Sequence, residues 1–201
     1  MISMLHLQPV GLPGVTALMI GGLLFFASLL WTRIGASRGS GEAGAKKSNR
    51  SKWGVFIQML GFFATGLGAI VIALPAASPL ALGEGLVVAA LMLLSVGLFT
   101  GAARAMGANW SIVARMRDGH ELVTGGVFAR IRHPIYTAMG AFLIAMSIAF
   151  GHEYGLILGF PLFAIGTAIR VREEENLLRS EFGAAYDDYA ARVKRFVPGM
   201  L

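Results

Sequence analysis

Long runs of apolar residues alternate with polar intervals along the chain. A helix needs about 20 apolar residues to cross a bilayer, and five runs of this kind occur, the last two being short. They cover residues 11–31, 54–75, 80–103, 135–151 and 154–169. The first run has no basic residue before it and is too long for a signal peptide, so we interpret it as a true span. The pattern predicts an all-α, polytopic membrane protein with five transmembrane helices.

Basic residues are confined to alternate intervals of this pattern. All 17 Lys and Arg lie in three intervals: six between the first and second runs, five between the third and fourth, and six after the fifth. Because Lys and Arg favour the cytoplasmic side of membrane proteins, we expect the N-terminus outside and the C-terminus in the cytoplasm. The net charge of +6 therefore requires no nucleic-acid partner, and the lipid bilayer is the expected surrounding of the chain.

The composition agrees with a membrane protein and narrows the chemistry. Hydrophobic residues make up 56% and charged residues 14% of the 201 residues, and the mean hydropathy is +0.68. The chain has no cysteine, which excludes thiolate chemistry, and its four scattered histidines make a poor metal site, so no metal is expected. The stretch GSGEAG at 39–44 matches a dinucleotide fingerprint but follows no predicted strand, and we interpret it as a flexible loop.

Turn-forming residues gather between the third and fourth apolar runs. The interval 104–134 contains DGH at 118–120, TGG at 124–126 and RHP at 132–134, which predicts a compact polar cap rather than one helix. Pro134 fits the first turn of a helix, which makes His133 its N-cap. A helix N-terminus beside an imidazole can hold a carboxylate or a phosphate. Alternatively, Arg130, Arg132 and His133 only anchor the fourth helix at the lipid headgroups.

The segment after the fifth run has the periodicity of an amphipathic helix. Leu178, Phe182 and Tyr189 recur at helical intervals, and Gly183 predicts a break, so one or two helices are expected on the cytoplasmic face. Arg170 and Glu174 are four residues apart and therefore share one helix face. This pair is either an exposed ion pair of little energetic value or part of a functional site, since charges at a membrane boundary are functional candidates.

Two stretches then carry a resemblance to a known family. They are NWSIVARMRDGHELVTGGVFARIRHPIYTA and RVREEENLLRSEFGAAYDDYAARVKRFVP, within residues 108–198. In order and spacing, the elements G-H-x-L-V, R-H-P-x-Y, R-x-x-x-E and F-G-x-x-Y-x-x-Y resemble the isoprenylcysteine carboxyl methyltransferase family, close to its short five-span prokaryotic members. The first hundred residues are similar to the family only as hydrophobic spans.

The resemblance implies a pocket for S-adenosylmethionine, which leaves as S-adenosylhomocysteine. The cofactor contacts that it implies are His120, Glu121, Leu122, Val123, Phe128, His133, Pro134, Tyr136 and Glu174. Phe128 stands where the family commonly has Tyr, so a hydroxyl contact is lost there while ring packing remains. Arg170 takes the place of the arginine that orients the acceptor carboxylate, and with Glu174 it forms the expected catalytic pair.

We also predict a division of labour within a single membrane domain spanning 1–201. Residues 1–103 form three scaffold spans and residues 104–201 the catalytic half. The first two apolar runs contain no ionisable residue, and Gln58 is the only amide in them, which agrees with a scaffold.

The implied reaction is methyl transfer to the carboxylate of a lipophilic acceptor with a prenyl or acyl tail, such as an isoprenylcysteine. A carboxylate is already ionised at neutral pH, so neither a general base nor a metal is needed. Two alternatives remain open at this point. One is N-methylation of an aminophospholipid headgroup, and the other is a non-catalytic membrane protein that binds the nucleoside.

Overall fold

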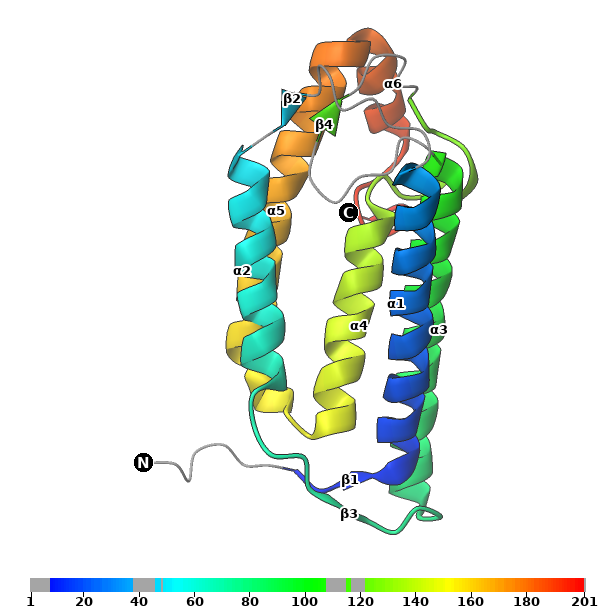
Figure 1. Cartoon of the computed structure of the whole chain (residues 1–201), viewed down its shortest axis with the longest axis vertical. Helices are drawn as coiled ribbons and strands as arrows, with labels where there is room; N and C mark the ends of the chain where they lie inside the picture. The colour runs from blue at the N-terminus through cyan, green and yellow to red at the C-terminus, as the bar shows by residue number, and fades with distance from the viewer. Residues whose placement is uncertain (1–7, 38–45, 48, 108–114, 117–121, 201) are drawn as a thin grey trace.

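The chain forms an elongated bundle of helices (Figure 1). The computed structural model describes residues 8–37, 46–47, 49–107, 115–116 and 122–200. Its helices are α1 (Leu12–Ser37), α2 (Asn49–Gly66), α3 (Pro79–Met106), α4 (Pro134–Phe150), α5 (Leu156–Phe182) and α6 (Ala184–Arg192), with 3₁₀ turns η2 (Gly126–Ala129) and η3 (Glu153–Gly155). Short strands pair at the two ends of the bundle: β1 (Val10–Gly11) with β3 (Ile72–Leu74), and β2 (Lys46–Lys47) with β4 (Arg115–Met116). The all-α prediction is confirmed.

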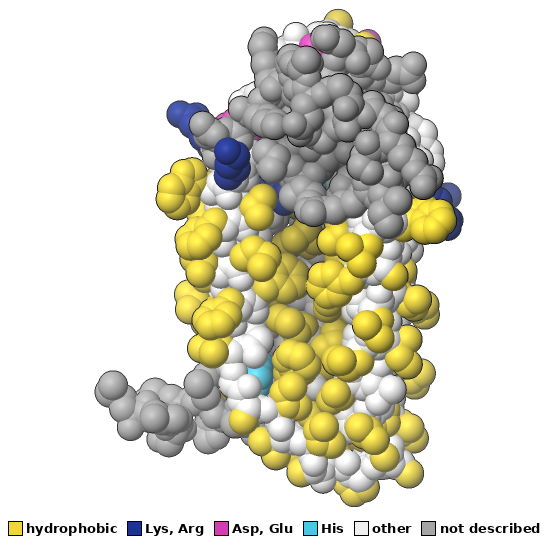
Figure 2. Space-filling view, viewed as in Figure 1, with side chains coloured by type: hydrophobic (Ala, Val, Ile, Leu, Met, Phe, Trp, Pro, Cys, Tyr) yellow, Lys and Arg dark blue, Asp and Glu magenta, His cyan; other side chains and the backbone are white. Residues whose placement is uncertain are grey.

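Three of the described helices are long and apolar enough to cross a membrane. They cover Leu12–Thr32, Pro79–Met106 and Glu153–Phe182, while the apolar helix Pro134–Phe150 is shorter. Large apolar side chains such as Trp31, Leu86 and Ile157 are 73–80% exposed, and such side chains cover much of the outer face in Figure 2. An apolar exterior of this extent is stable in lipid and not in water. The chain is therefore a multi-pass membrane protein.

The second predicted span, 54–75, is wrong at its C-terminal end. Helix α2 ends at Gly66, and the following residues leave the helix. Gly68 has a φ of 146°, which L side chains rarely adopt, and Pro75 disfavours helical geometry at the residue before it. The apolar residues that continue the run instead form β3, which pairs in parallel with β1.

Helix α2 places its small and polar residues inward and its large apolar residues outward. The buried stripe consists of Ser51, Gly54, Gln58, Gly61 and Thr65, whereas Trp53, Phe56, Met59 and Phe63 are exposed. The stripe faces α5, where a Cβ added at Gly166 would lie 2.6 Å from the Gly54 carbonyl oxygen. Small residues at the contact thus bring the backbones of α2 and α5 close together, as is usual between membrane helices.

Helix α3 forms a second packing group with α1 and α4. Its buried side chains include Val88 and Met92, which contact Leu18 of α1 and Ala145 of α4. Phe142 of α4 lies with its ring centroid 6.0 Å from that of Phe62 on α2, which links the two groups. Figure 1 shows which helix termini share one end of the bundle: the C-terminal ends of α1, α3 and α5 and the N-terminal ends of α2 and α4.

Helix α5 extends well beyond the predicted fifth span, 154–169. It continues to Phe182 as one helix, so the charged residues that follow residue 169 belong to the same rod as the apolar span. Gly183, with a φ of 50°, ends this helix and begins α6. The predicted break at Gly183 is confirmed.

Candidate active site

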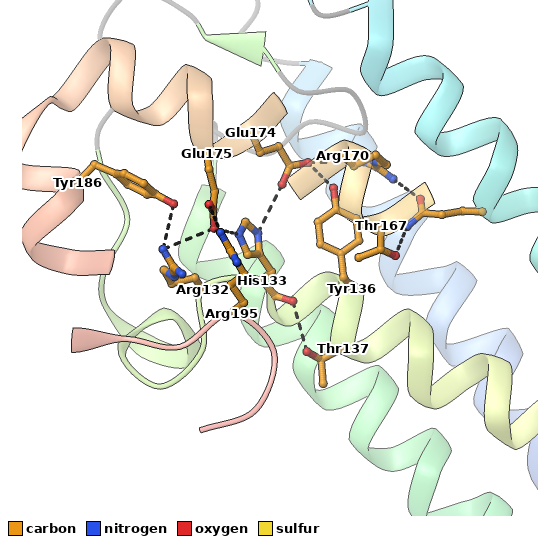
Figure 3. A network of polar contacts seen from close by, with 11 residues as sticks. Arg132, His133, Tyr136, Thr137, Thr167, Arg170, Glu174, Glu175, Tyr186 and Arg195 are labelled. Atoms are coloured by element: carbon orange, nitrogen blue, oxygen red, sulfur yellow. Dashed lines mark hydrogen bonds and ion pairs between the residues drawn. The ribbon is translucent and has the colours of Figure 1, made fainter. Parts of the chain in front are cut away.

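A polar cluster occupies the end of the bundle where α4 begins and the charged part of α5 passes (Figure 3). His133 is the N-cap of α4 and Pro134 stands in its first turn, as predicted. Proline is suited to this position because its fixed φ is helical and its missing N–H has no intrahelical partner there. The His133 carbonyl accepts hydrogen bonds from the backbone N–H groups of Tyr136 and Thr137. Its imidazole makes no capping bond and extends toward α5.

Glu174 is the carboxylate of this cluster that remains partly accessible, with 26% of its side chain exposed. The Tyr136 hydroxyl donates a hydrogen bond to its Oε1 atom. Arg170 Nη2 lies 3.8 Å from the same oxygen, and His133 Nδ1 lies 3.7 Å from Oε2. Side chains of α4 and α5 thus surround one carboxylate at the edge of the bundle.

Glu175, the next residue, has a different environment and is only 3% exposed. Arg195 binds it through both ends of the guanidinium, with Nε 2.9 Å from Oε1 and Nη2 2.8 Å from Oε2. His133 Nε2 lies 3.2 Å from Oε1, and Arg132 Nη1 lies 3.5 Å from it. A bidentate arginine fork and two further positive groups make this carboxylate a structural centre of the cluster.

The imidazole of His133 therefore lies between two glutamates. Burial lowers the pKa of His133 and is the largest single effect, but hydrogen bonds and charge attraction from Glu174 and Glu175 outweigh it together. The net result is a pKa above the ordinary value of histidine. When it is protonated, His133 neutralises part of the negative charge that two adjacent carboxylates bring into this site.

The chain after α6 folds back beside the start of α4. The backbone N–H groups of Arg132 and His133 donate to the carbonyls of Lys194 and Arg195, at 2.8 and 2.9 Å. Farther along, the Thr137 hydroxyl donates to the Phe196 carbonyl at 3.0 Å. This return holds Arg195 against Glu175 and fixes the position of His133.

Helix α6 closes the cluster on its outer side. The Tyr189 hydroxyl donates to the Phe128 carbonyl at 2.7 Å, and burial raises the pKa of Tyr189 to about 12. Tyr186 is buried as well, and its hydroxyl accepts a hydrogen bond from Arg132 Nη1 at 3.4 Å. The two tyrosines of the F-G-x-x-Y-x-x-Y element thus tie α6 to the segment before α4.

Arg170 lies on the bundle side of Glu174 and is 8% exposed. Its Nη1 atom donates to Gln58 Oε1 at 3.0 Å, and the Gln58 amide donates in turn to Thr167 Oγ1 at 2.8 Å. The guanidinium carbon lies 5.0 Å from the centre of the Tyr136 ring. The burial of Arg170 excludes a solvent-screened surface ion pair as its whole role.

The structure brings together five of the predicted site residues, places three more in the segment before α4, and does not describe the other two. His133, Pro134, Tyr136, Arg170 and Glu174 meet at the junction of α4 and α5. Half-buried Leu122 and Val123 precede η2, and buried Phe128 belongs to it. His120 and Glu121 lie outside the described residues.

Sequence reasoning missed several members of the cluster. Nothing distinguishes Glu175 from the glutamates before it, and no motif marks Arg195. Gln58 is distinctive in the sequence as the only amide in the first two apolar runs. Its contact with Arg170, however, joins residues 112 positions apart, which no local pattern indicates.

Residues 84–180 match the sequence model of the isoprenylcysteine carboxyl methyltransferase family. This region belongs to that family. It contains α4 and the part of α5 that carries Arg170 and Glu174. The predicted resemblance to this family is confirmed.

Curated relatives agree with the family assignment. A protein-S-isoprenylcysteine O-methyltransferase from Dictyostelium discoideum is 29% identical over 85 residues, covering 42% of this chain and 35% of the relative. Protein-S-isoprenylcysteine O-methyltransferase B from Arabidopsis thaliana is 32% identical over 95 residues, covering 43% and 44%. The Schizosaccharomyces pombe protein-S-isoprenylcysteine O-methyltransferase is 31% identical over 88 residues, covering 43% and 37%. The chain thus spans less than half the length of the curated relatives that it matches.

Proposed function

We propose that the chain is a membrane methyltransferase that moves the methyl group of S-adenosylmethionine to the carboxylate of a prenylated cysteine. Membership of the isoprenylcysteine carboxyl methyltransferase family and the names of the relatives support methyl transfer to such an acceptor. The observation that carries the proposal is the adjacency of two different groups. A partly accessible carboxylate, Glu174, lies 3.8 Å from a buried guanidinium, Arg170.

The residues around Glu174 fit the polar end of this cofactor. The cofactor offers an ammonium group and ribose hydroxyls, all donors, and an accessible carboxylate is a good acceptor for them. Tyr136 and His133 contact Glu174 and hold it in place. In the segment before α4, half-buried Leu122 and Val123 would supply apolar surface. When bound, the cofactor supplies an electrophilic methyl group on a sulfonium.

Arg170 is suited to hold the acceptor. A guanidinium presents parallel N–H groups that match a carboxylate, and it keeps its charge when buried. The carboxylate needs no deprotonation at neutral pH, so the contribution of the protein is orientation and the partial removal of water. Exposed apolar side chains on the helices that pair at Arg170, such as Phe56 of α2 and Ile165 of α5, suit the tail of a lipid-dissolved acceptor.

We also propose five membrane-crossing helices with the site on the cytoplasmic side. The described basic residues lie at the ends of α3 and α5, at the start of α2 and beside the site, which is one end of the bundle. From the positive-inside rule we expect that end in the cytoplasm and the N-terminus outside. Helices α2 and α4 then cross in a bundle whose longer members are α1, α3 and α5.

Labelled cofactor and matched acceptors test the proposed reaction. The purified chain in phospholipid vesicles containing phosphatidylethanolamine is given methyl-labelled S-adenosylmethionine and N-acetyl-S-farnesylcysteine. We expect label in the farnesylcysteine, released by mild base because the product is an ester. The methyl ester of the same acceptor, whose carboxylate is blocked, serves as the control and should take up no label.

The alternatives give other results in the same assay. Base-stable label in phosphatidylethanolamine would replace carboxylate methylation by N-methylation of an aminophospholipid. Saturable binding of S-adenosylhomocysteine with no label in either acceptor would favour a non-catalytic nucleoside-binding protein.

A further inference from the structure

Gln58 of α2 is held by hydrogen bonds at both ends of its amide. Its Oε1 atom accepts from Arg170 Nη1 at 3.0 Å, and its Nε2 atom donates to Thr167 Oγ1 at 2.8 Å. The donor to Thr167 and the acceptor for Arg170 are on opposite sides of the amide, so the two contacts define its orientation. Gln58 is 1% exposed. Gln58 thus links Thr167 to Arg170, which Figure 3 shows beside Glu174.

The backbone around Gln58 is built for this contact. A Cβ added at Gly54, one turn before Gln58, would lie 2.4 Å from Arg170 Cγ. A Cβ at Gly166, one turn before Arg170, would lie 2.7 Å from Gln58 Cγ. Two glycines therefore let α2 and α5 approach until the amide reaches the guanidinium. An apolar side chain at position 58 would pack between α2 and α5 equally well in a membrane, so packing alone does not explain an amide here.

We propose that Gln58 is a positioning residue for methyl transfer, which fixes the guanidinium of Arg170 in the orientation that receives the acceptor carboxylate. This inference rests on the proposed function and adds α2 to the machinery of the reaction. It also changes the prediction that residues 1–103 are scaffold alone, because one side chain of that region would act through Arg170.

A neutral amide suits position 58 because Arg170 must keep its positive charge to attract the acceptor carboxylate. Arginine has a long flexible side chain that loses conformational entropy when it binds a ligand. A contact that already fixes the side chain reduces this entropic cost of binding. Gln58 fixes Nη1 without cancelling the positive charge of Arg170, whereas a glutamate at the same position would pair with it. Glu174 already lies 3.8 Å from Nη2 of this guanidinium, so a second fixed carboxylate at position 58 would cancel more of the charge that attracts the acceptor carboxylate.

Three variants separate positioning from packing. Gln58→Leu removes both hydrogen bonds at similar size, and Gln58→Glu keeps an acceptor for Arg170 while adding a competing charge. Thr65→Val is the matched control, because Thr65 is buried on the same stripe of α2 two turns away and, among the described residues, its hydroxyl donates to the Gly61 carbonyl of its own helix. The backbone carbonyl of Thr65, which contacts His152, is not changed by this substitution. Each variant is assayed for melting temperature, affinity for S-adenosylhomocysteine, and kcat and KM with N-acetyl-S-farnesylcysteine.

We expect Gln58→Leu to lower kcat/KM for the acceptor about 10-fold or more, the effect of losing a hydrogen bond to a charged group. Gln58→Glu should raise the acceptor KM several-fold although it folds well. Both should bind S-adenosylhomocysteine within about 3-fold of the unmodified chain, because Glu174 keeps its partners on α4. Thr65→Val should leave all these constants nearly unchanged.

Two results would overturn the inference. If Gln58→Glu turns over like the unmodified chain, a charge at this position does not compete with the acceptor and the amide is only structural. If Gln58→Leu and Thr65→Val lose activity and stability together to the same degree, Gln58 serves helix packing. Where Gln58→Leu fails to fold, the Gln58→Glu comparison decides alone. Absence of methyl transfer by the unmodified chain would instead refute the proposed function, and the inference with it.

Discussion

Replacing each of the two adjacent glutamates by glutamine should give opposite phenotypes. The change is the same in chemistry and size, and it differs by one position in the chain. Glu175→Gln removes the charge that Arg195, Arg132 and His133 share, and we expect a large loss of stability. Glu174→Gln removes a charge with one hydrogen bond and two longer contacts, and we expect a small loss of stability with weaker cofactor binding.

The magnitudes follow from the exposure of the partners. Breaking a buried ion pair costs about 3–5 kcal/mol, because the remaining charge stays buried. The Arg132 side chain is 10% and the His133 side chain 5% exposed, but that of Arg195 is 49% exposed and regains water. We therefore expect about 2–4 kcal/mol for Glu175→Gln. For Glu174→Gln we expect about 1 kcal/mol or less, since the amide oxygen can still accept from Tyr136.

Thermal unfolding in detergent and titration with S-adenosylhomocysteine measure the two effects. At about 2–4 °C per kcal/mol for a chain of this size, Glu175→Gln should melt about 4–16 °C lower, and Glu174→Gln less than about 4 °C lower. S-adenosylhomocysteine should bind more weakly to Glu174→Gln at temperatures where the variant is folded. Equal melting temperatures of the two variants, or normal cofactor affinity of Glu174→Gln, would refute the assignment of one structural and one ligand-binding glutamate.

Three further predictions concern neighbouring groups. Arg170→Lys should cut acceptor methylation about 10-fold or more while S-adenosylhomocysteine binds within about 3-fold, because the charge stays and the fork geometry is lost; unchanged turnover would contradict a carboxylate acceptor. Because the pKa of His133 is raised in the folded state, its contribution to stability is complete below about pH 6.5 and is lost as the pH rises through the folded-state pKa. The melting temperature of the unmodified chain should therefore fall more between about pH 6 and pH 9 than that of His133→Gln. Parallel pH profiles of the two proteins would disprove this. Gly166→Ala should lower stability and turnover, since its Cβ would lie 2.6 Å from a backbone oxygen, whereas Gly97→Ala on α3, with nothing within 4 Å, should be neutral or slightly stabilising in a melting assay.

The local patterns predicted those parts of the fold that local chemistry determines. Hydrophobic runs indicated the helices, Pro134 indicated the first turn of α4, and Gly183 indicated the break before α6. The failure at α2 has a physical reason, because hydropathy continues past Gly66 while backbone geometry does not. Apolar character alone cannot distinguish a membrane helix from an apolar strand that follows it.

The site was predictable where a motif carries the chemistry within a few residues. The i, i+4 spacing brought Arg170 and Glu174 to one face, and the R-H-P-x-Y element brought His133 and Tyr136 to the start of α4. Neither pattern shows which of the two neighbouring glutamates is the more deeply buried. That depends on Arg195, which arrives from a segment that folds back along residues 131–133.

The contact between Gln58 and Arg170 could not be read from any local pattern, because it depends on how closely two helices approach. A glycine in an apolar run is compatible with packing against any partner, and the sequence does not name α5 as the neighbour of α2. Once the two helices are paired, Gly54 and Gly166 determine the separation, and that separation decides whether an amide of fixed length reaches the guanidinium. Adding one methyl group at Gly54 or Gly166 therefore changes the position of Arg170 relative to Gln58. The contact between α2 and α5 is thus part of the proposed chemistry as well as part of the fold.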